Sequence, residues 1–169
     1  MPPFVGSLAN AQGLNAAQWG SFAGMAYTIG SITGYISLGF LADRFGRKPV
    51  TFAFFVCALL LTPVLFFSTT DLTLVLVFAF ANAIFSNGQY TWMPVWLPEL
   101  YPTRMRATAL AFAFNAPRFI AFMGPLLAGS MIVAFGGFGK AAMILSSIYI
   151  VGIIAVLMLP ETNGKPLPS

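Results

Sequence analysis

Charged residues are scarce in this chain. Its 169 residues include 8 Lys and Arg, 4 Asp and Glu and no His, so that 7% are charged while 59% are hydrophobic. An average soluble domain carries roughly a quarter charged residues. So few charges cannot cover a surface that faces water, and we therefore expect lipid to surround most of the chain.

Other absences exclude classes of function. The single cysteine, Cys57, cannot form an internal disulfide, and the sequence offers no cluster of metal ligands. There is no glycine loop of the phosphate-binding kind and no nucleophile paired with a base, so we predict no enzyme, no catalytic residue and no cofactor. The net charge of +4 does not predict a nucleic-acid partner, because basic loops in a membrane chain first signal topology.

Long apolar stretches predict membrane spans. Crossing a hydrocarbon core of ~30 Å takes about 20 mostly apolar residues in a helix. Segments of this kind occupy residues 21–41, 49–67, 72–97, 108–135 and 141–159. We predict an all-α, polytopic membrane helical bundle with about five transmembrane helices. Residues 1–19 are expected to form an external loop, or to include at 2–5 the stub of an earlier helix.

The positions of the basic residues predict the orientation of the spans. Six loop cations fall in the first loop, the third loop and the tail, namely Arg44, Arg47, Lys48, Arg104, Arg106 and Lys165. Lys140 alone lies in a loop on the other side. Because loops rich in Lys and Arg stay in the cytoplasm, we expect the tail 160–169 to be cytoplasmic and the N-terminus to lie outside the cell (inner) membrane. Without a signal peptide, an outside N-terminus predicts that earlier helices are missing from this chain.

Three stretches carry a resemblance to a known family. Residues 39–48 read GFLADRFGRK and hold four of the charged residues, residues 97–108 read LPELYPTRMRAT, and residues 160–165 read PETNGK. They resemble the loop after the second helix of each six-helix half, the loop between helices ten and eleven, and the tail after helix twelve in the major facilitator superfamily. Within it, the organic-ion, aromatic-acid and metabolite symporters are most similar.

The resemblance implies helices eight to twelve of a twelve-helix secondary transporter, with residues 2–5 as the end of helix seven. The partners it implies are the lipid bilayer, a small organic solute and a missing N-terminal half. Alternating access would move the solute, which we expect to be an organic acid or related metabolite. The alternative is a non-transporting membrane fragment or scaffold that has lost its N-terminal half.

The charged loop at 39–48 is a candidate gate. Gly39 would allow close helix approach, Gly46 would permit the turn, and Asp43 could face a helix N-terminus. The resemblance implies that Asp43 meets a helix in the missing half, and that Glu99 forms a second latch with Arg47 or Arg104. Arg44 belongs to the same predicted gate. The alternative is a solvated loop that only sets topology.

Arg118 is the sharpest candidate for substrate contact. It lies ten residues into the fourth predicted span, roughly 15 Å from its start at 1.5 Å per residue, where a charge is costly and is a functional hypothesis by default. Asn115 lies three residues earlier on the same face, and the pair could bind a carboxylate through a guanidinium fork and an amide donor. Alternatively, Arg118 bonds carbonyls freed by Pro117, or snorkels.

Polar side chains also recur within the apolar spans. Asn82, Ser86 and Tyr90 are spaced by four residues and share a helix face with Asn87 and Gln89 beside them, and a weaker stripe holds Tyr27, Ser31 and Tyr35. We assign Tyr27, Asn82 and Ser86 to the substrate site; interhelical hydrogen bonding is the alternative. The pairs Gly20/Gly24 and Gly30/Gly34 predict close helix packing instead. No acid lies within a predicted span, so any proton-carrying carboxylate is expected in the missing half.

Overall fold

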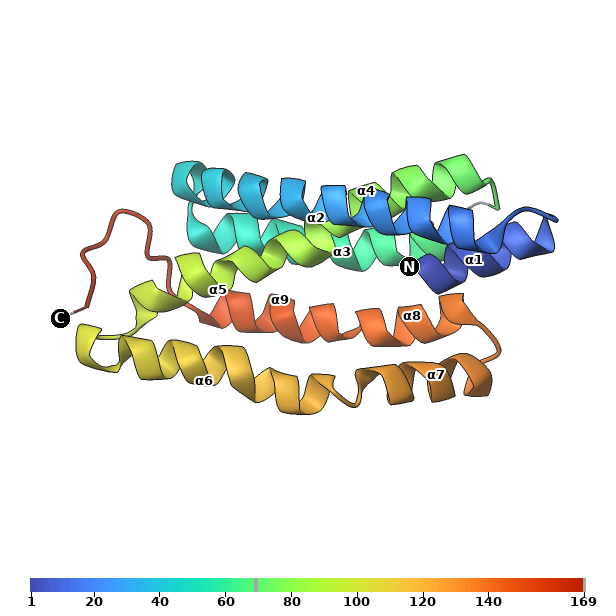
Figure 1. The fold of residues 1–169 in the computed structure, drawn as a ribbon. Coiled ribbons are helices and arrows are strands. Elements are labelled where there is room, and N and C mark those ends of the chain that lie inside the picture. Colours follow the sequence, from blue (N-terminus) through green and yellow to red (C-terminus); the bar gives the residue numbers. More distant parts are fainter. Residues whose placement is uncertain (69, 169) are drawn as a thin grey trace.

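Helices account for all regular secondary structure in the part of this computed structural model that is described, residues 1–68 and 70–168 (Figure 1). The elements are α1 (Pro2–Ala11), α2 (Ala16–Phe45), α3 (Arg47–Phe67), α4 (Leu72–Gly88), the 3-10 turn η1 (Gln89–Thr91), α5 (Trp92–Val95), the 3-10 turn η2 (Leu97–Leu100), α6 (Thr103–Ala121), α7 (Gly124–Ala134), α8 (Phe138–Ser146) and α9 (Ile148–Met158).

Side-chain caps mark where two of the long helices begin. The Oδ1 atom of Asn15 accepts hydrogen bonds from the backbone N–H groups of Ala17 and Gln18, at 3.0 and 3.1 Å, before α2. Asp71 accepts one from Leu74 at 3.0 Å before α4. These caps satisfy N–H groups that have no partner inside a helix.

Four stretches among the described residues are long and apolar enough to cross a membrane: Ala16–Phe45, Arg47–Phe67, Leu72–Leu100 and Phe138–Met158. They correspond to four of the five predicted spans. The fifth, 108–135, is divided between α6 and α7, which follow one another with a break between them (Figure 1). The proline at position 125 has no N–H to bond the carbonyl of Ala121, so a continuous helix would lack one backbone hydrogen bond at this point. The predicted all-helical membrane bundle is confirmed.

The N-terminal segment differs from the exposed loop that was one of the two expectations for residues 1–19. It forms α1 from Pro2 to Ala11, longer than the stub expected at 2–5, and α1 packs chiefly on α2. Phe4, Val5 and Ala9 are buried in one cluster with side chains of α3 and α4. Their spacing places them on one helix face. This face was not recognised from the sequence because the whole segment is low in polarity.

The closest helix contact joins α2 and α4 at glycines. A Cβ atom added to Gly30 or Gly34 would overlap the backbone carbonyl of Phe80 or Ile84, and one on Gly88 would lie 2.8 Å from the carbonyl oxygen of Gly34. The packing role predicted for Gly30 and Gly34 is therefore confirmed. No described residue lies within 4 Å of a Cβ atom placed at Gly39, so the close helix approach expected there is not made by this part of the chain.

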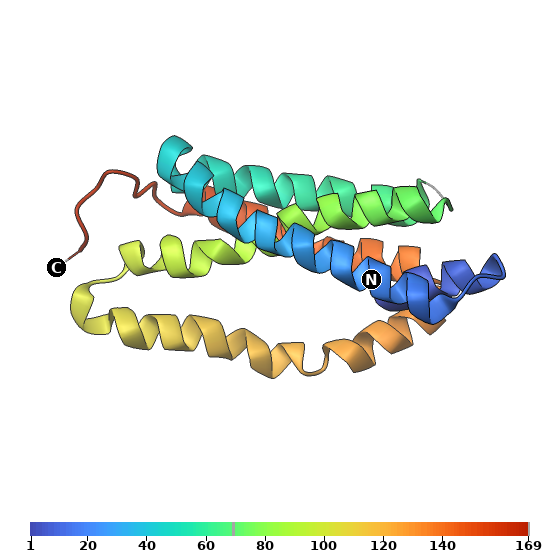
Figure 2. The same cartoon turned by 45° about the horizontal axis from the view of Figure 1, so that its top comes forward.

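Helices α6 and α7 lie apart from the layer that contains α2, α3 and α4 (Figures 1 and 2). The main contacts of α6 are with α5 and η2 at one end, and those of α7 are with α8 at the other. The side chains of Phe112 and Phe119 on α6 are 74% and 77% exposed. The break between the two helices thus lies in the least covered part of the chain.

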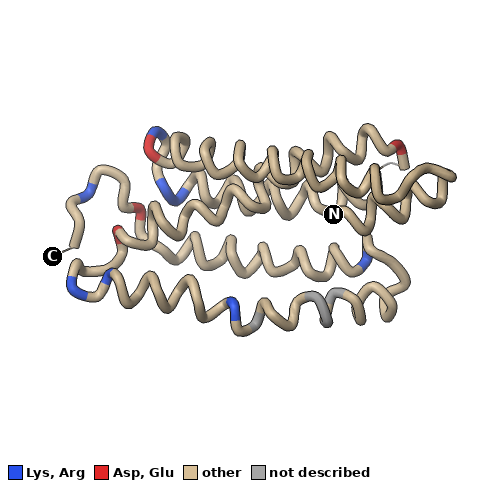
Figure 3. The backbone as a smooth tube through the Cα atoms, viewed as in Figure 1, with Lys and Arg blue, Asp and Glu red and all other residues tan. Residues whose placement is uncertain are grey.

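Most charged residues gather at one end of the bundle (Figure 3). The end of α2, the start of α3, η2, the start of α6 and the tail after α9 meet there (Figure 1). The start of α4, which Asp71 caps, and the start of α8, which contains Lys140, lie at the opposite end (Figure 1). Arg118 lies near the last turn of α6, between the two ends.

Candidate functional site: a charged end and an uncharged pocket

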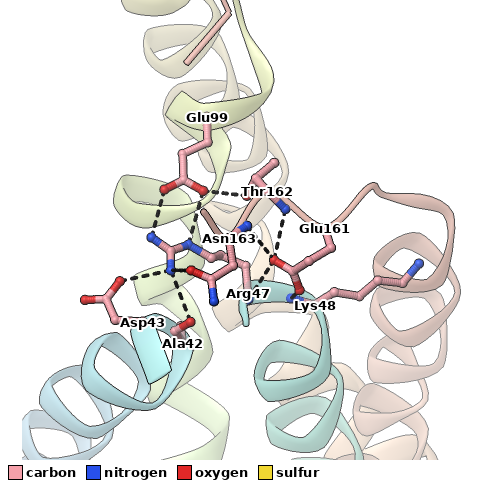
Figure 4. A network of polar contacts seen from close by, with 8 residues as sticks. All are labelled: Ala42, Asp43, Arg47, Lys48, Glu99, Glu161, Thr162 and Asn163. Atoms are coloured by element: carbon pink, nitrogen blue, oxygen red, sulfur yellow. Dashed lines mark hydrogen bonds and ion pairs between the residues drawn. The ribbon is translucent and has the colours of Figure 1, made fainter. Parts of the chain in front are cut away.

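Arg47, the first residue of α3, is the centre of the charged end (Figure 4). Its Nε and Nη2 atoms donate to the two carboxylate oxygens of Glu99 at 3.1 and 2.9 Å. Its Nη1 atom donates to the carbonyl of Ala42 and to Asn163 Oδ1, at 3.1 and 2.9 Å, and lies 3.0 Å from Asp43. One guanidinium therefore joins α2, α3, η2 and the tail, with the bidentate geometry that suits arginine.

Glu161 in the tail caps the N-terminus of α3 (Figure 4). Its carboxylate accepts hydrogen bonds from the backbone N–H groups of Arg47 and Lys48 at 3.0 and 2.9 Å, and from Thr162 and Asn163 at 2.9 Å each. Burial alone would raise the pKa of Glu161, but these four N–H groups together lower it. A carboxylate is favoured here because the positive end of the helix dipole faces it.

The turn before α3 depends on Gly46. This residue has φ +101°, a conformation that favours glycine, so the predicted role of Gly46 in the turn is confirmed. A Cβ atom at Gly46 would also lie 2.8 Å from Glu161 Oε2. Asp43 lies in the last turn of α2 with a side chain that is 69% exposed, and at the start of α3 it is Glu161 that faces the helix N-terminus.

The predicted gating residues are only partly brought together. Of the two partners considered for Glu99, Arg47 is the one in contact. Asp43 also pairs with Arg47, so it has a partner within this chain. Arg44 instead lies over the ring of Phe45, 5.5 Å from its centroid, and Arg104 is exposed, with no ion pair among the described residues.

From the sequence, the tail was placed on the same side as the basic loops, but its contacts with Arg47 and Glu99 were missed. Thr162 donates a hydrogen bond to Glu99, and Asn163 and Glu161 bind Arg47. A signal was available, since Glu161 follows the last span on the side where the basic loops were placed. Because the chain has few acids, the carboxylate of Glu161 was the obvious partner for the cations of these loops.

A pocket of about 450 Å³ lies further along the bundle, between α2, α3, the α4–α5 segment and α9. The predicted residues Tyr27 and Ser86 line it, and so do Asn87, Gln89 and Tyr90 from the same polar stripe. Tyr149 on α9 was not predicted, because a single tyrosine in an apolar run gives no periodic signal. The volume is within the range of small-molecule sites.

A chain of hydrogen bonds runs from the pocket toward α3. Tyr27 Oη lies 3.3 Å from Ser86 Oγ, which donates to Asn82 Oδ1 at 3.3 Å. Asn82 Nδ2 donates to Thr62 Oγ1 at 3.1 Å, and Thr62 donates to the carbonyl of Ala58 at 2.8 Å. The polar stripe thus faces the pocket at Ser86 and forms interhelical hydrogen bonds at Asn82. Of the two interpretations, pocket lining therefore applies to Ser86 and interhelical hydrogen bonding to Asn82.

Arg118 and Asn115 lie on α6, away from this pocket. Arg118 Nη1 donates to Asn115 Oδ1 at 3.4 Å, and Asn115 Nδ2 donates to the carbonyl of Ala111 at 2.7 Å. Both residues are exposed, and neither lines the pocket with Tyr27 and Ser86. The structure therefore does not bring the two predicted parts of the substrate site together. Among residues 1–68 and 70–168, no group of three or more His, Cys, Asp or Glu is placed to hold a metal ion.

Several known transporters are similar to this chain in sequence. A metabolite transport protein by name, from Haemophilus influenzae, is 34% identical over 139 residues, which cover 82% of this chain and 34% of that protein. A glycine betaine/proline/ectoine/pipecolic acid transporter of Dickeya dadantii is 32% identical over 85% of this chain and 29% of its own length. A cis,cis-muconate transport protein of Acinetobacter baylyi is 31% identical over 85% and 36%.

The chain spans about a third of the length of the curated relatives it matches. The family model of the Major Facilitator Superfamily matches residues 1–169. The resemblance noted in three loops thus extends over the whole chain. The chain belongs to the Major Facilitator Superfamily, a family of multi-pass membrane transporters and not of enzymes.

Proposed function

We propose that this chain forms part of a secondary transporter that moves a small organic acid or related metabolite by alternating access. The observation that carries the proposal is the pocket of about 450 Å³ among candidate membrane spans, lined by Tyr27 and Ser86. Polar groups inside lipid are costly unless they serve a solute path or one another. The names of the relatives, which cover metabolites, osmolytes and an organic acid, support the same class.

We further propose that the charged end faces the cytoplasm and acts as a gate. Asp43, Arg44, Arg47, Glu99 and Arg104 would hold one conformer and separate in the other. Ion pairs near water are individually worth about 0–1 kcal/mol, which suits a switch between states of nearly equal free energy. A single cysteine introduced for Lys165, with Cys57 replaced by Ser, tests the orientation through labelling from the cytoplasmic side only.

Arg118 and Asn115 remain our proposed contact for the carboxylate of the solute. Their mutual contact at 3.4 Å supports a paired role, since a guanidinium and an amide side by side offer several donors to one carboxylate. The substitution Arg118→Lys removes the fork while keeping the charge. We expect it to weaken solute affinity in uptake assays; unchanged affinity would contradict the role.

An uptake assay tests the main proposal. The chain is expressed alone and fused to the first two thirds of the Haemophilus influenzae relative, and uptake of labelled organic acids is measured at matched membrane levels. We expect uptake by the fusion and none by the chain alone. In the fusion, Ser86→Ala should lower uptake, whereas Ser37→Ala should not, because the hydroxyl of Ser37 bonds only Gly34 of its own helix.

Two outcomes would overturn this proposal. A fusion that reaches the membrane with no uptake would favour the non-transporting scaffold. Clear uptake by the chain alone would show that it needs no further part.

A further inference from the structure

Several polar groups around the pocket donate hydrogen bonds to other groups of the protein. Thr62 donates to Ala58, Asn82 donates to Thr62, and Ser86 donates to Asn82. Because a serine hydroxyl has one hydrogen, Ser86 must accept in its contact with Tyr27, and Tyr27 must donate. The oxygen of Tyr27 therefore has a free lone pair beside the pocket.

The two amides at the pocket follow the same pattern. Asn87 Nδ2 donates to Ser31 Oγ at 2.9 Å, and Gln89 Nε2 donates to the carbonyl of Ser86 at 2.8 Å. Gln89 Oε1 is buried and has no hydrogen-bond partner in the described part of the chain. Each amide nitrogen donates one of its two hydrogens to the protein, and the oxygen of Gln89 is left without a donor among the described residues.

Aromatic rings form much of the pocket wall. Tyr27, Phe55, Tyr90, Trp92 and Tyr149 come from five different helical elements. Among the described residues that line the pocket, none carries a formal charge. Ring faces attract cations, whereas a carboxylate would lose its hydration without gaining a positive partner.

We infer that this pocket binds the positively charged nitrogen of a small solute, an ammonium or methylated ammonium group, through acceptor oxygens and aromatic faces. The inference rests on the proposed function, because it takes the pocket to be a solute site. The inference narrows the class of solute from an organic acid to a zwitterion, whose charged nitrogen would lie in the pocket and whose carboxylate would lie outside it.

Direct binding to the whole chain in lipid nanodiscs tests this inference without requiring transport. Equilibrium dialysis would use labelled choline and ethanolamine as cations without a carboxylate, and benzoate as a carboxylate without a cation. We expect both cations to bind and benzoate not to bind. Tighter binding of choline would indicate a methylated nitrogen, and tighter binding of ethanolamine would indicate one that donates hydrogen bonds; either result supports the site.

A negative charge added to the pocket wall tests the inference most directly. Asn87 is only half-buried, so Asn87→Asp should fold, and we expect it to raise the affinity for choline about tenfold or more through the added negative charge. Gln18→Glu is the matched control, since it adds the same charge at an exposed position outside the pocket. Tyr90→Leu should lower choline affinity about tenfold by removing a ring face.

Each remaining result overturns the inference. These results are binding of benzoate in place of the cations, no binding of any of the three probes, or weaker choline binding by Asn87→Asp. Cation binding without uptake in the fusion assay would instead refute the transport proposal and leave this site standing. Uptake confined to acids that lack a cationic nitrogen would refute the cation site and leave the transport proposal standing.

Discussion

The charged end and the α2–α4 interface join helices by different means. At the charged end, the guanidinium of Arg47 and the carboxylates of Glu99 and Glu161 connect four segments through polar contacts. At the α2–α4 interface, Gly30, Gly34 and Gly88 bring the two backbones into contact. A charged side chain costs little free energy only where water can reach it. In an apolar interior, dispersion contacts and neutral hydrogen bonds stabilise the packing of helices. The following variants test this contrast, from the largest expected effect to the smallest.

Gly34→Ala tests the interface. The new Cβ atom would overlap the backbone carbonyl of Ile84, which belongs to the opposing helix and cannot move alone. We expect the free energy of unfolding in detergent to fall by about 3 kcal/mol. Gly39→Ala is the matched control on the same helix: its Cβ would meet nothing within 4 Å, so it should be neutral or slightly stabilising. Equal effects of the two variants would refute the close contact.

Arg47→Met tests the charged end. It leaves Glu99, whose side chain is 19% exposed, without its ion partner, and we expect a loss of about 2 kcal/mol in the free energy of unfolding. Arg104→Met removes the same charge from an exposed position and should cost little. Combining Arg47→Met with Glu99→Gln measures the coupling, and additive effects would show that the pair contributes nothing.

Glu161→Gln tests the cap through pH. The pKa of Glu161 is lowered in the folded chain, so its stabilising contribution is present above its ordinary value of 4.5 and is lost as the pH falls through the lowered pKa. We expect the variant to be less stable by about 1 kcal/mol at pH 7, and this difference to shrink below pH 4. Unfolding curves between pH 3 and 7 measure it. A difference that grows on acidification would contradict the cap.

Asp43→Asn should have the smallest effect on stability, about 0.5 kcal/mol, because its ion pair is largely exposed. If Asp43 belongs to a gate, the same variant should lower uptake by the fusion protein much more than stability. Lys140→Gln, a charge removed at the opposite end, is the control. Unchanged uptake by Asp43→Asn would remove Asp43 from the gate.

Much of the fold follows from the sequence, because apolar length alone decides which segments can span a bilayer. Four of the predicted spans match helices to within a few residues. The fifth differs since a length criterion does not register the proline at 125 or the three arginines in α6. Helix α1 was not predicted because its segment is short and its burial depends on contacts with α2, α3 and α4.

The candidate site could be predicted only where its residues repeat along one helix. Ser86 was predicted from the stripe on α4, and Tyr27 from the weaker stripe on α2. Tyr149 comes from a helix nearly sixty residues further along, and Glu161 binds Arg47 across 114 positions. Such pairings are set by tertiary packing, which leaves no local pattern in the sequence.

The cap on α3 has a consequence for the order of assembly. The N–H groups of Arg47 and Lys48 emerge from the ribosome long before Glu161, and the helices from α4 to α9 lie between them in the sequence. Until Glu161 reaches them, the start of α3 has only water or lipid headgroups as acceptors. The cap on α3 can therefore form only after the chain has been synthesised past α9, and it requires the tail after α9 to reach the start of α3.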